Sequence, residues 1–389
     1  MTKKKWNVSF LNVSLLCLML MTLLVSCGLP QDTAQLSGEH EISPSLTYDC
    51  EMELDYAEEF TVDYYDGGYA LITISDGSRF LVVPEESEIP AHLEEDIVIL
   101  KQPITNIYLV ASAVMDMLVS IEAADSVRLS GTKEDGWYIE EAKEAMASGE
   151  ISYAGKYNMP DYERILDANC GLAIESTMIL HSPEVKENLE DFGIPVLIDR
   201  SSYETHPLGR TEWVKLYGVL LEKEQEAEAA FQQQKMALDS IVDEETQEKT
   251  VAFFFITSNG MVSVRKSGDY VPKMIELAGG KYVFSDLGDD TASSSVNMQM
   301  EEFYATAKDA DYLVYNSTID GGVLSKEELL KKSPLLEDFK AFAEGNVFCT
   351  TQNLYQESMN AGTFILDMHQ MLTEEESEDE TFSYLFRLE

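Results

Sequence analysis

The chain has 389 residues and is strongly acidic, with 71 aspartates and glutamates against 27 lysines and arginines and a formal net charge of −44. This balance excludes a nucleic-acid-binding protein, whose affinity depends on basic side chains that neutralise phosphates. It also argues against a polybasic contact with a membrane surface. The length is sufficient for two domains of ordinary size, each with a hydrophobic core.

Residues 1–26 have the pattern of a secretory signal peptide. Three consecutive lysines, residues 3–5, precede an apolar stretch that is densest over residues 15–25. This stretch is shorter than the roughly 20 apolar residues that span a bilayer. The letters LVSC, which end at Cys27, look like a bacterial lipobox, in which Cys27 is acylated and becomes the first mature residue. An uncleaved membrane anchor is the alternative. Either way, we expect residues 27–48 to be a polar tether on the extracytoplasmic face of the cell membrane.

The remaining cysteines and the histidines do not form a recognisable metal or disulfide pattern. Cys50, Cys170 and Cys349 are widely spaced and no CxxC occurs, so neither a disulfide framework nor a zinc site is expected. The five histidines lack ligand spacing such as HxxxH. We therefore expect no intrinsic metal or cofactor. His206 could ligate haem iron or a metal, although a histidine before proline more often fixes a turn.

Residues 49–102 are predicted to form a small β-rich accessory segment. The runs FTVDYY, YALITIS and RFLVVP are separated by the turn signals DGG and SDGS. Apolar runs divided by glycine-containing turns are typical of hairpins. The segment contains no residues that suggest chemistry.

Residues 103–206 are predicted to form an N-terminal α/β lobe. Short apolar runs alternate with helical stretches, a spacing that predicts βαβ units and a parallel sheet of Rossmann type. The expected strands are 107–111, 127–131, 151–155, 171–176 and 194–199, and the expected helices are 114–121, 138–148, 161–169 and 183–192.

Residues 207–248 are predicted to form one long linking helix. Apolar residues recur at intervals of three, four and seven from Trp213 to Ile241, and neither proline nor glycine follows Gly218 in this stretch. At 1.5 Å per residue the part from Trp213 to Ile241 would span roughly 43 Å. We therefore expect a rigid connection between two α/β lobes.

Residues 249–389 are predicted to form a C-terminal α/β lobe in which the alternation resumes. Residues 162–177 and 301–318 share a plan of acidic helix start, polar turn, apolar strand and Ser-Thr, which indicates structural duplication. The expected strands are 250–257, 261–266, 311–316 and 346–351, and the expected helical stretches are 269–280, 298–310, 325–344 and 357–372.

From about residue 104 to residue 371 the chain resembles the Fe³⁺-siderophore, haem and cobalamin substrate-binding lipoproteins of ABC importers. The matching stretches include YAGKYNMPDYERIL, SYETHPLGRTEWVKLYG and VRKSGDYVPKMIELAGGKYVF. The resemblance implies two α/β lobes joined by a long helix, with an iron chelate, haem or corrinoid bound between them. It also implies a monomer that delivers its ligand to a membrane permease with a cytoplasmic ATPase.

The resemblance further implies one surface glutamate per lobe that docks onto arginines of the permease. Glu163 matches this position in the first lobe, and Glu302 or Glu301 matches it in the second. Carboxylates on separate lobes would report the lobe geometry to a basic partner. The alternative is that each acid is only favoured at a helix N-terminus by the macrodipole.

A cleft for such a ligand needs aromatic walls and a few polar groups, and arginine suits carboxylates because it binds them bidentately. Trp213 could instead be core, the tyrosines could be ordinary boundary residues, and Arg210 could pair with Glu204 or Glu212. The cleft candidates are Tyr157, Arg210, Trp213, Arg265, Tyr270 and Tyr355.

Enzyme signatures are missing from the sequence. GxSxG, the P-loop and GxGxxG do not occur, and paired acids are too frequent in this chain to discriminate. We therefore expect a binding protein and not an enzyme. A secreted α/β hydrolase and a receptor for a divalent metal are the alternatives.

Overall fold

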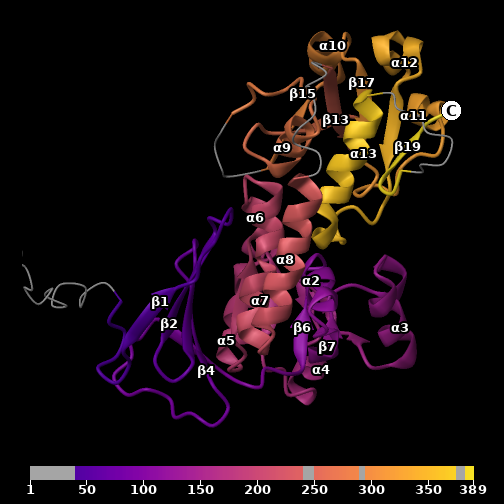
Figure 1. Cartoon of the computed structure of the whole chain (residues 1–389). Helices are drawn as coiled ribbons and strands as arrows, with labels where there is room; N and C mark the ends of the chain where they lie inside the picture. Colours follow the sequence, from indigo (N-terminus) through magenta and orange to yellow (C-terminus); the bar gives the residue numbers. More distant parts are fainter. Residues whose placement is uncertain (1–39, 240–248, 289–293, 374–381) are drawn as a thin grey trace, which may run out of the picture. The chain divides into compact units, whose positions relative to one another are not determined.

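The computed structural model describes residues 40–239, 249–288, 294–373 and 382–389. By internal contacts the chain divides into two units, residues 1–42 and residues 43–389. The predicted signal peptide and Cys27 lie outside the described residues, and the account below concerns the second unit (Figure 1). Over the described ranges, no helix combines the length and the apolar character needed to cross a membrane.

The β-rich segment forms a five-stranded N-terminal sheet in the order β1-β2-β3-β4-β5. The first three pairings are antiparallel and β5 joins β4 in parallel. Gly67 and Gly68 turn the chain between β2 and β3 at φ values of 89° and 82°, which glycine adopts without steric cost. The strands are β1 (Tyr48–Glu51), β2 (Phe60–Tyr65), β3 (Tyr69–Ile74), β4 (Arg79–Val83) and β5 (Ile97–Lys101).

The N-terminal α/β lobe, residues 103–206, is called lobe one below, and the C-terminal α/β lobe, residues 249–389, is called lobe two. Lobe one contains a five-stranded sheet in the order β12-β11-β6-β7-β8, and every pairing in it is parallel. The α/β prediction for this part of the chain is therefore confirmed. Its strands are β6 (Ile107–Leu109), β7 (Val127–Ser130), β8 (Ser152–Tyr153), β11 (Ala173–Ser176) and β12 (Val196–Asp199), with a small hairpin of β9 (Gly155–Lys156) and β10 (Met159–Pro160). Its helices are α2 (Val114–Ser120), α3 (Glu140–Ser148), α4 (Tyr162–Asp167) and α5 (Pro183–Asp191).

Lobe two contains a seven-stranded sheet that is mixed, with both parallel and antiparallel pairings. The pairings β13–β15, β13–β17 and β17–β18 are parallel, whereas β14, β16 and β19 run antiparallel to their neighbours. The reason is local, because β13 and β14 are joined by a tight turn at Gly260 and not by a crossover helix. The strands are β13 (Thr250–Ile256), β14 (Val262–Arg265), β15 (Lys281–Tyr282), β16 (Ser295–Met298), β17 (Tyr312–Tyr315), β18 (Val347–Thr350) and β19 (Leu385–Arg387).

The helices of lobe two begin with α9, which Asp269 caps by accepting the N–H of Val271 at 2.9 Å. The predicted helical stretch 325–344 is divided by Pro334 into α11, a 3₁₀ turn and α12. The helices are α9 (Tyr270–Leu277), α10 (Met300–Ala307), α11 (Lys326–Lys332), α12 (Lys340–Glu344) and α13 (Ala361–Thr373).

The linker is not one long helix, and this part of the prediction is wrong. It comprises α6 (Pro207–Glu212), α7 (Val214–Leu221) and α8 (Glu224–Asp239), and α8 folds back along α7. The chain reverses at Glu222, whose backbone is left-handed at φ 59°. The reversal is favoured because Gly218 lets Ala227 approach closely, and because Lys215 pairs with Glu228 at 3.1 Å. Residues 221–224 contain neither proline nor glycine. The apolar periodicity of the sequence therefore continues across the reversal between α7 and α8, and the sequence does not indicate that the helix ends there.

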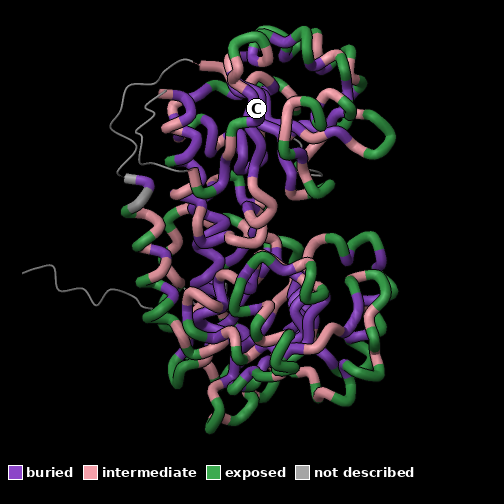
Figure 2. The backbone as a smooth tube through the Cα atoms, turned by 90° about the vertical axis from the view of Figure 1, so that its right-hand side faces the viewer, coloured by how far each residue is buried: buried purple, intermediate pink, exposed green. Residues whose placement is uncertain are grey.

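One continuous hydrophobic core joins the N-terminal sheet, one face of the lobe one sheet, the linker and lobe two. Helices α6 and α7 are buried over almost their whole length, and Figure 2 shows this buried stretch (purple) between the two lobes. Phe60 of the N-terminal sheet packs edge-on against Trp213, with ring centroids 5.1 Å apart. The N-terminal sheet therefore shares a hydrophobic core with the lobes and the linker.

Candidate ligand-binding cleft

Lobe two contributes a wall in which Arg265 and Tyr355 meet. Arg265 ends β14, and its guanidinium donates to the phenol oxygen of Tyr355 and lies over that ring at 5.1 Å. The buried amide of Asn316 donates to the same oxygen at 3.1 Å. Asn316 follows β17 and Tyr355 follows β18, so both lie at the carboxyl ends of parallel strands, where open α/β sheets bind ligands.

Because the Tyr355 oxygen accepts two hydrogen bonds, its own hydrogen must point elsewhere. None of the described residues accepts this hydrogen. Burial raises the pKa of Tyr355, so the group remains a phenol at neutral pH. It can therefore donate one hydrogen bond to an oxygen of a bound ligand.

Asp269 forms an ion pair with the guanidinium of Arg265. The two groups lie 3.3 Å apart, and the Asp269 side chain is wholly buried. Burial raises the pKa of Asp269 while the charge of Arg265 opposes that shift. Arg265 retains 15% exposure of its side chain, which leaves part of the cation accessible.

Arg210 lies at the junction of the linker and lobe two and is only 6% exposed. Its guanidinium donates to the Tyr270 hydroxyl and, at 3.0 Å, to the backbone oxygen of Tyr355. Its Nε is buried without a hydrogen-bond partner among the described residues. The alternative pairing with Glu204 or Glu212 is wrong, because both carboxylates bind backbone N–H groups of residues 55–59.

Lobe one contributes a hollow of about 380 Å³ at the carboxyl ends of its parallel strands. Tyr157, which follows β9, is half-buried in its wall beside Lys133 and Ser176. Gly131 follows β7 and lines the hollow, and a Cβ there would lie only 3.0 Å from Val110, so the strand ends pack tightly at this point.

The two walls are joined by hydrogen bonds between the loop before α3 and the loop after β18. The Gln356 amide accepts the N–H of Tyr138 at 2.8 Å and donates to the backbone oxygen of Gly136 at 2.8 Å. The hydroxyl of Tyr138 donates to Gln352. Since Gly136 lines the lobe one hollow and Tyr355 precedes Gln356, these contacts place the two walls next to each other.

Trp213 does not reach the cleft, so this candidate is corrected to a core residue. Its side chain is fully buried, packs against Phe60 and donates from Nε1 to Glu204 at 2.8 Å. The core alternative therefore holds, because helix α7 starts against the N-terminal sheet and not against lobe two. The structure brings together four candidates, Arg210, Arg265, Tyr270 and Tyr355, and places Tyr157 on the opposite wall.

Sequence reasoning missed Lys133, Trp137 and Asn316. Lys133 and Trp137 line a second hollow of about 690 Å³ on the loop before α3, which shares Lys133 and Asp135 with the first hollow. The indole Nε1 of Trp137 is buried without a partner in the described structure. A signal was available for two of them, since Lys133 closely follows the predicted strand 127–131 and Asn316 ends the predicted strand 311–316.

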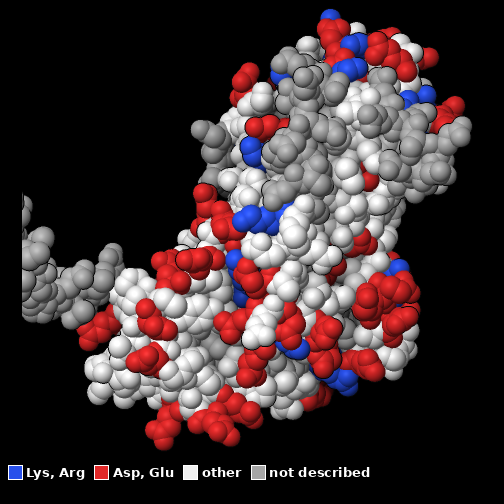
Figure 3. Space-filling view, viewed as in Figure 1, with Lys and Arg blue, Asp and Glu red and all other residues white. Residues whose placement is uncertain are grey.

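The docking candidates lie on separate lobes. Glu163 is exposed in the first turn of α4, which is capped by Asp161, and Glu301 and Glu302 are exposed in the first turn of α10. Figure 3 shows acidic side chains spread over the face in view, with few basic ones between them. Position alone therefore does not single out these glutamates.

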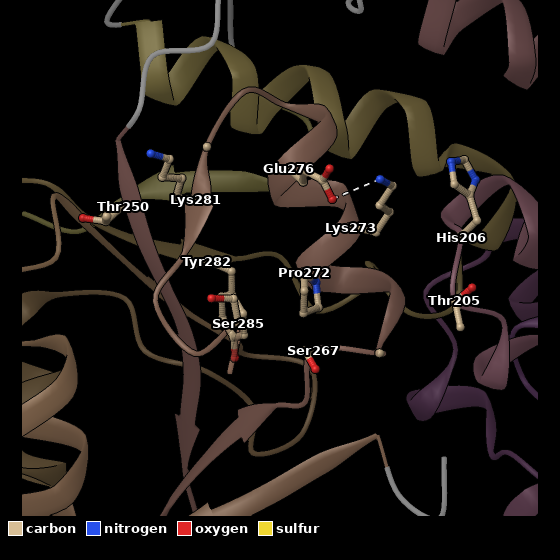
Figure 4. Close-up of a pocket in the computed structure, with 12 residues that line it drawn as sticks. Thr205, His206, Thr250, Ser267, Pro272, Lys273, Glu276, Lys281, Tyr282 and Ser285 are labelled. Carbon is tan, nitrogen blue, oxygen red and sulfur yellow. Dashed lines mark hydrogen bonds and ion pairs between the residues drawn. The ribbon is translucent and has the colours of Figure 1, made fainter. Parts of the chain in front are cut away.

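Another hollow, of about 650 Å³, borders α9, β15 and the start of the linker (Figure 4). Its wall includes an ion pair of Lys273 and Glu276 at 3.0 Å. His206 also lines it, accepts the N–H of Leu208 at 3.2 Å and stacks on Tyr56 at 4.4 Å. Burial lowers the pKa of His206. These contacts match the turn-fixing alternative for this histidine.

Metal-ligating side chains do not gather in threes anywhere in the described ranges. Cys170 and Cys349 are free thiols in or beside the core, and burial raises the pKa of each to about 11. Both therefore remain uncharged at neutral pH and behave as small apolar residues.

Comparison with known proteins identifies the class to which this fold and cleft belong. A family model described as periplasmic binding protein matches residues 109–354, so the chain belongs to the periplasmic binding protein family. Members of this family are substrate-binding transport proteins, and the resemblance found in the sequence is confirmed.

Particular relatives extend this result. Two uncharacterized lipoproteins of Methanocaldococcus jannaschii are each 25% identical to the chain, over 89% and 88% of its length and 88% of their own. A haem-binding protein of Pseudomonas aeruginosa shares the fold at a TM-score of 0.58, with 15% identity over 73% of this chain and 98% of that one. An Fe³⁺-hydroxamate transport protein of Saccharomonospora viridis gives 0.55, with 16% identity over 69% and 93%.

Proposed function

We propose that this protein is the substrate-binding lipoprotein of an ABC importer and captures an anionic iron complex, a siderophore chelate or haem, between its two lobes. The observation that carries the proposal is the wall formed by Arg265, Tyr355 and Asn316 at the carboxyl ends of the lobe two strands. A corrinoid is the third ligand class that the same cleft could accept.

Charge supports an anionic ligand. In a chain of net charge −44, three basic side chains lie on the two walls, Arg265 on lobe two and Lys133 and Lys156 on lobe one, beside the acids Asp269 and Asp135. Arginine binds carboxylate oxygens through two parallel N–H groups, and such charge-assisted bonds are about twice as strong as neutral ones. The Tyr355 hydroxyl adds a neutral donor beside this cation.

We further propose that Cys27 is acylated and holds the mature chain on the extracytoplasmic face of the cell membrane. The two M. jannaschii relatives are lipoproteins by name, which supports this anchor. The partners are then a permease with its cytoplasmic ATPase, and Glu163 and either Glu302 or Glu301 are the docking acids of a monomeric receptor.

Ligand titration of the purified protein tests the cleft. Haemin, ferric siderophores and cobalamin are added separately, and the quenching of tryptophan fluorescence is followed. We expect one ligand to bind tightly, and Arg265→Ala to weaken it about 10- to 100-fold, since a hydrogen bond to a charged group contributes about 1.5–3 kcal/mol. Tyr355→Phe should weaken it less, because it removes a neutral donor.

Arg128→Ala is the matched control, since Arg128 is an exposed arginine on β7 that donates to the backbone oxygens of residues 149 and 150. The proposal fails if none of the ligands binds at micromolar concentration. It also fails if Arg265→Ala and Arg128→Ala bind equally well.

A further inference from the structure

The N-terminal sheet lies outside the residues that the family model matches. The family match begins at residue 109, after β5 has ended at Lys101. Residues before 109 make up more than a quarter of the chain, so an alignment over 89% of it must include part of them. The M. jannaschii relatives therefore share at least part of this N-terminal region.

Glu212, at the end of α6, binds the loop that precedes β2. Its carboxylate is completely buried and accepts the backbone N–H groups of Asp55, Tyr56 and Ala57 at 2.8 to 2.9 Å. Lys215 balances the charge at 3.0 Å. A buried carboxylate with this many donors is well satisfied, so the contact fixes the loop to the helix.

Glu204, just before α6, binds the next two residues of the same loop. Its oxygens accept the N–H groups of Glu58 at 2.9 Å and Glu59 at 3.0 Å, and the indole N–H of Trp213. Five successive backbone N–H groups, from residue 55 to residue 59, are thus bound by two carboxylates of the linker region. Gly209 permits this approach, because a side chain there would lie 2.9 Å from the backbone oxygen of Tyr56.

Between these two acids, α6 carries Arg210 to lobe two. Arg210 contacts the Tyr270 hydroxyl and the backbone oxygen of Tyr355. Tyr270 lies shortly after the cleft-lining Arg265 in the chain, and Tyr355 directly precedes Gln356. A helix of six residues with both ends held has little freedom to tilt. The loop 55–59, the helix α6 and the lobe two wall therefore form one connected set of contacts.

We propose that the N-terminal sheet positions the ligand-binding wall of lobe two through α6. Glu204 and Glu212 are positioning residues in this arrangement: they hold α6 against residues 55–59, and Arg210 transmits that position to Tyr270 and Tyr355. Only the ligand arm of the test below rests on the proposed importer function, because the positioning itself is measured without a ligand.

Hydrogen exchange of the full chain, measured by mass spectrometry, tests this positioning role. The variants are Glu212→Gln and Glu204→Gln, each of which replaces a carboxylate by a neutral amide. We expect exchange to accelerate at least tenfold in residues 53–60, and also in α6 and in peptides that contain Tyr270 and Tyr355. Glu226→Gln is the control, since Glu226 is an exposed acid of α8 that pairs with Lys223. It should change none of these peptides.

Arg210→Lys separates positioning from simple stability. This variant should accelerate exchange around Tyr270 and Tyr355 while residues 53–60 remain protected. With haemin as the probe, Glu212→Gln should slow association about three- to tenfold.

The inference is overturned if Glu212→Gln and Glu204→Gln affect only residues 53–60, or if Arg210→Lys leaves the lobe two peptides unchanged. Failure of the wild type to bind haemin, siderophores or cobalamin would instead overturn the proposed function, and the exchange results would still decide the positioning role.

Discussion

At the residue scale, Glu175 is a buried acid whose carboxyl group lacks a hydrogen-bond partner within the described structure. It lies on β11, between β12 and β6 in the lobe one sheet, and is fully buried. Burial raises the pKa of Glu175 to about 8. The side chain is therefore a neutral carboxylic acid at pH 7, since an unpaired buried charge would be strongly unfavourable.

This gives stability a definite pH dependence. Between the ordinary pKa of 4.5 and about 8, Glu175 is ionised in the unfolded chain but protonated in the folded one. The folded state then binds more protons, so its stability falls as pH rises, by up to about 1.4 kcal/mol per pH unit in this window.

Glu175→Gln should remove this slope and be more stable than the wild type at pH 8. Urea unfolding at pH 5, 6.5 and 8 measures it, with exposed Glu187→Gln as the control, and parallel curves for Glu175→Gln and wild type would contradict it.

At the scale of elements, the linker hairpin depends on close contact between α7 and α8. A Cβ added at Gly218 would be 2.7 Å from the Cβ of Ala227, closer than packed side chains allow. Gly218→Ala should therefore destabilise the protein by about 1–3 kcal/mol, as overpacking does, in spite of the better helix propensity of alanine. Gly268→Ala, which meets open space, is the control. Urea unfolding that shows Gly218→Ala to be as stable as the wild type would mean that the two helices separate without cost.

The predicted helices and strands were largely confirmed at this scale. The predicted strand 311–316 is β17 (Tyr312–Tyr315), and the predicted helix 161–169 contains α4. In the two similar segments, α4 precedes β11 and α10 precedes β17, so the shared sequence plan corresponds to a shared helix–strand unit. The prediction failed at residues 221–224, because the reversal there is stabilised by Gly218 and Ala227 on different helices and not by a local turn residue.

At the scale of the whole molecule, the proposed function requires both lobes to meet the permease. Replacing Glu163 and Glu302 together by lysine should abolish uptake of radioactive iron by cells while leaving ligand affinity within about twofold, because both side chains are exposed. Glu301→Lys, combined with Glu163→Lys, distinguishes the two candidates on α10. The control reverses Glu187 of α5 and Glu344 of α12, which are also exposed acids, one on each lobe. Loss of ligand affinity in the Glu163/Glu302 variant would show that these acids serve the cleft or the fold instead.

By itself the sequence determined the class of this protein: two α/β lobes, a connecting helical region, a β-rich N-terminal segment and the residues that end strands near the cleft. Hydrophobic periodicity and strand ends are local properties, so they can be read along the chain. Only the tertiary structure decided that the linker folds back, that Trp213 is core, and that Glu204 and Glu212 bind residues 55–59 and not Arg210. Those contacts join residues about 150 positions apart, and such pairings leave no periodic signal in a single sequence.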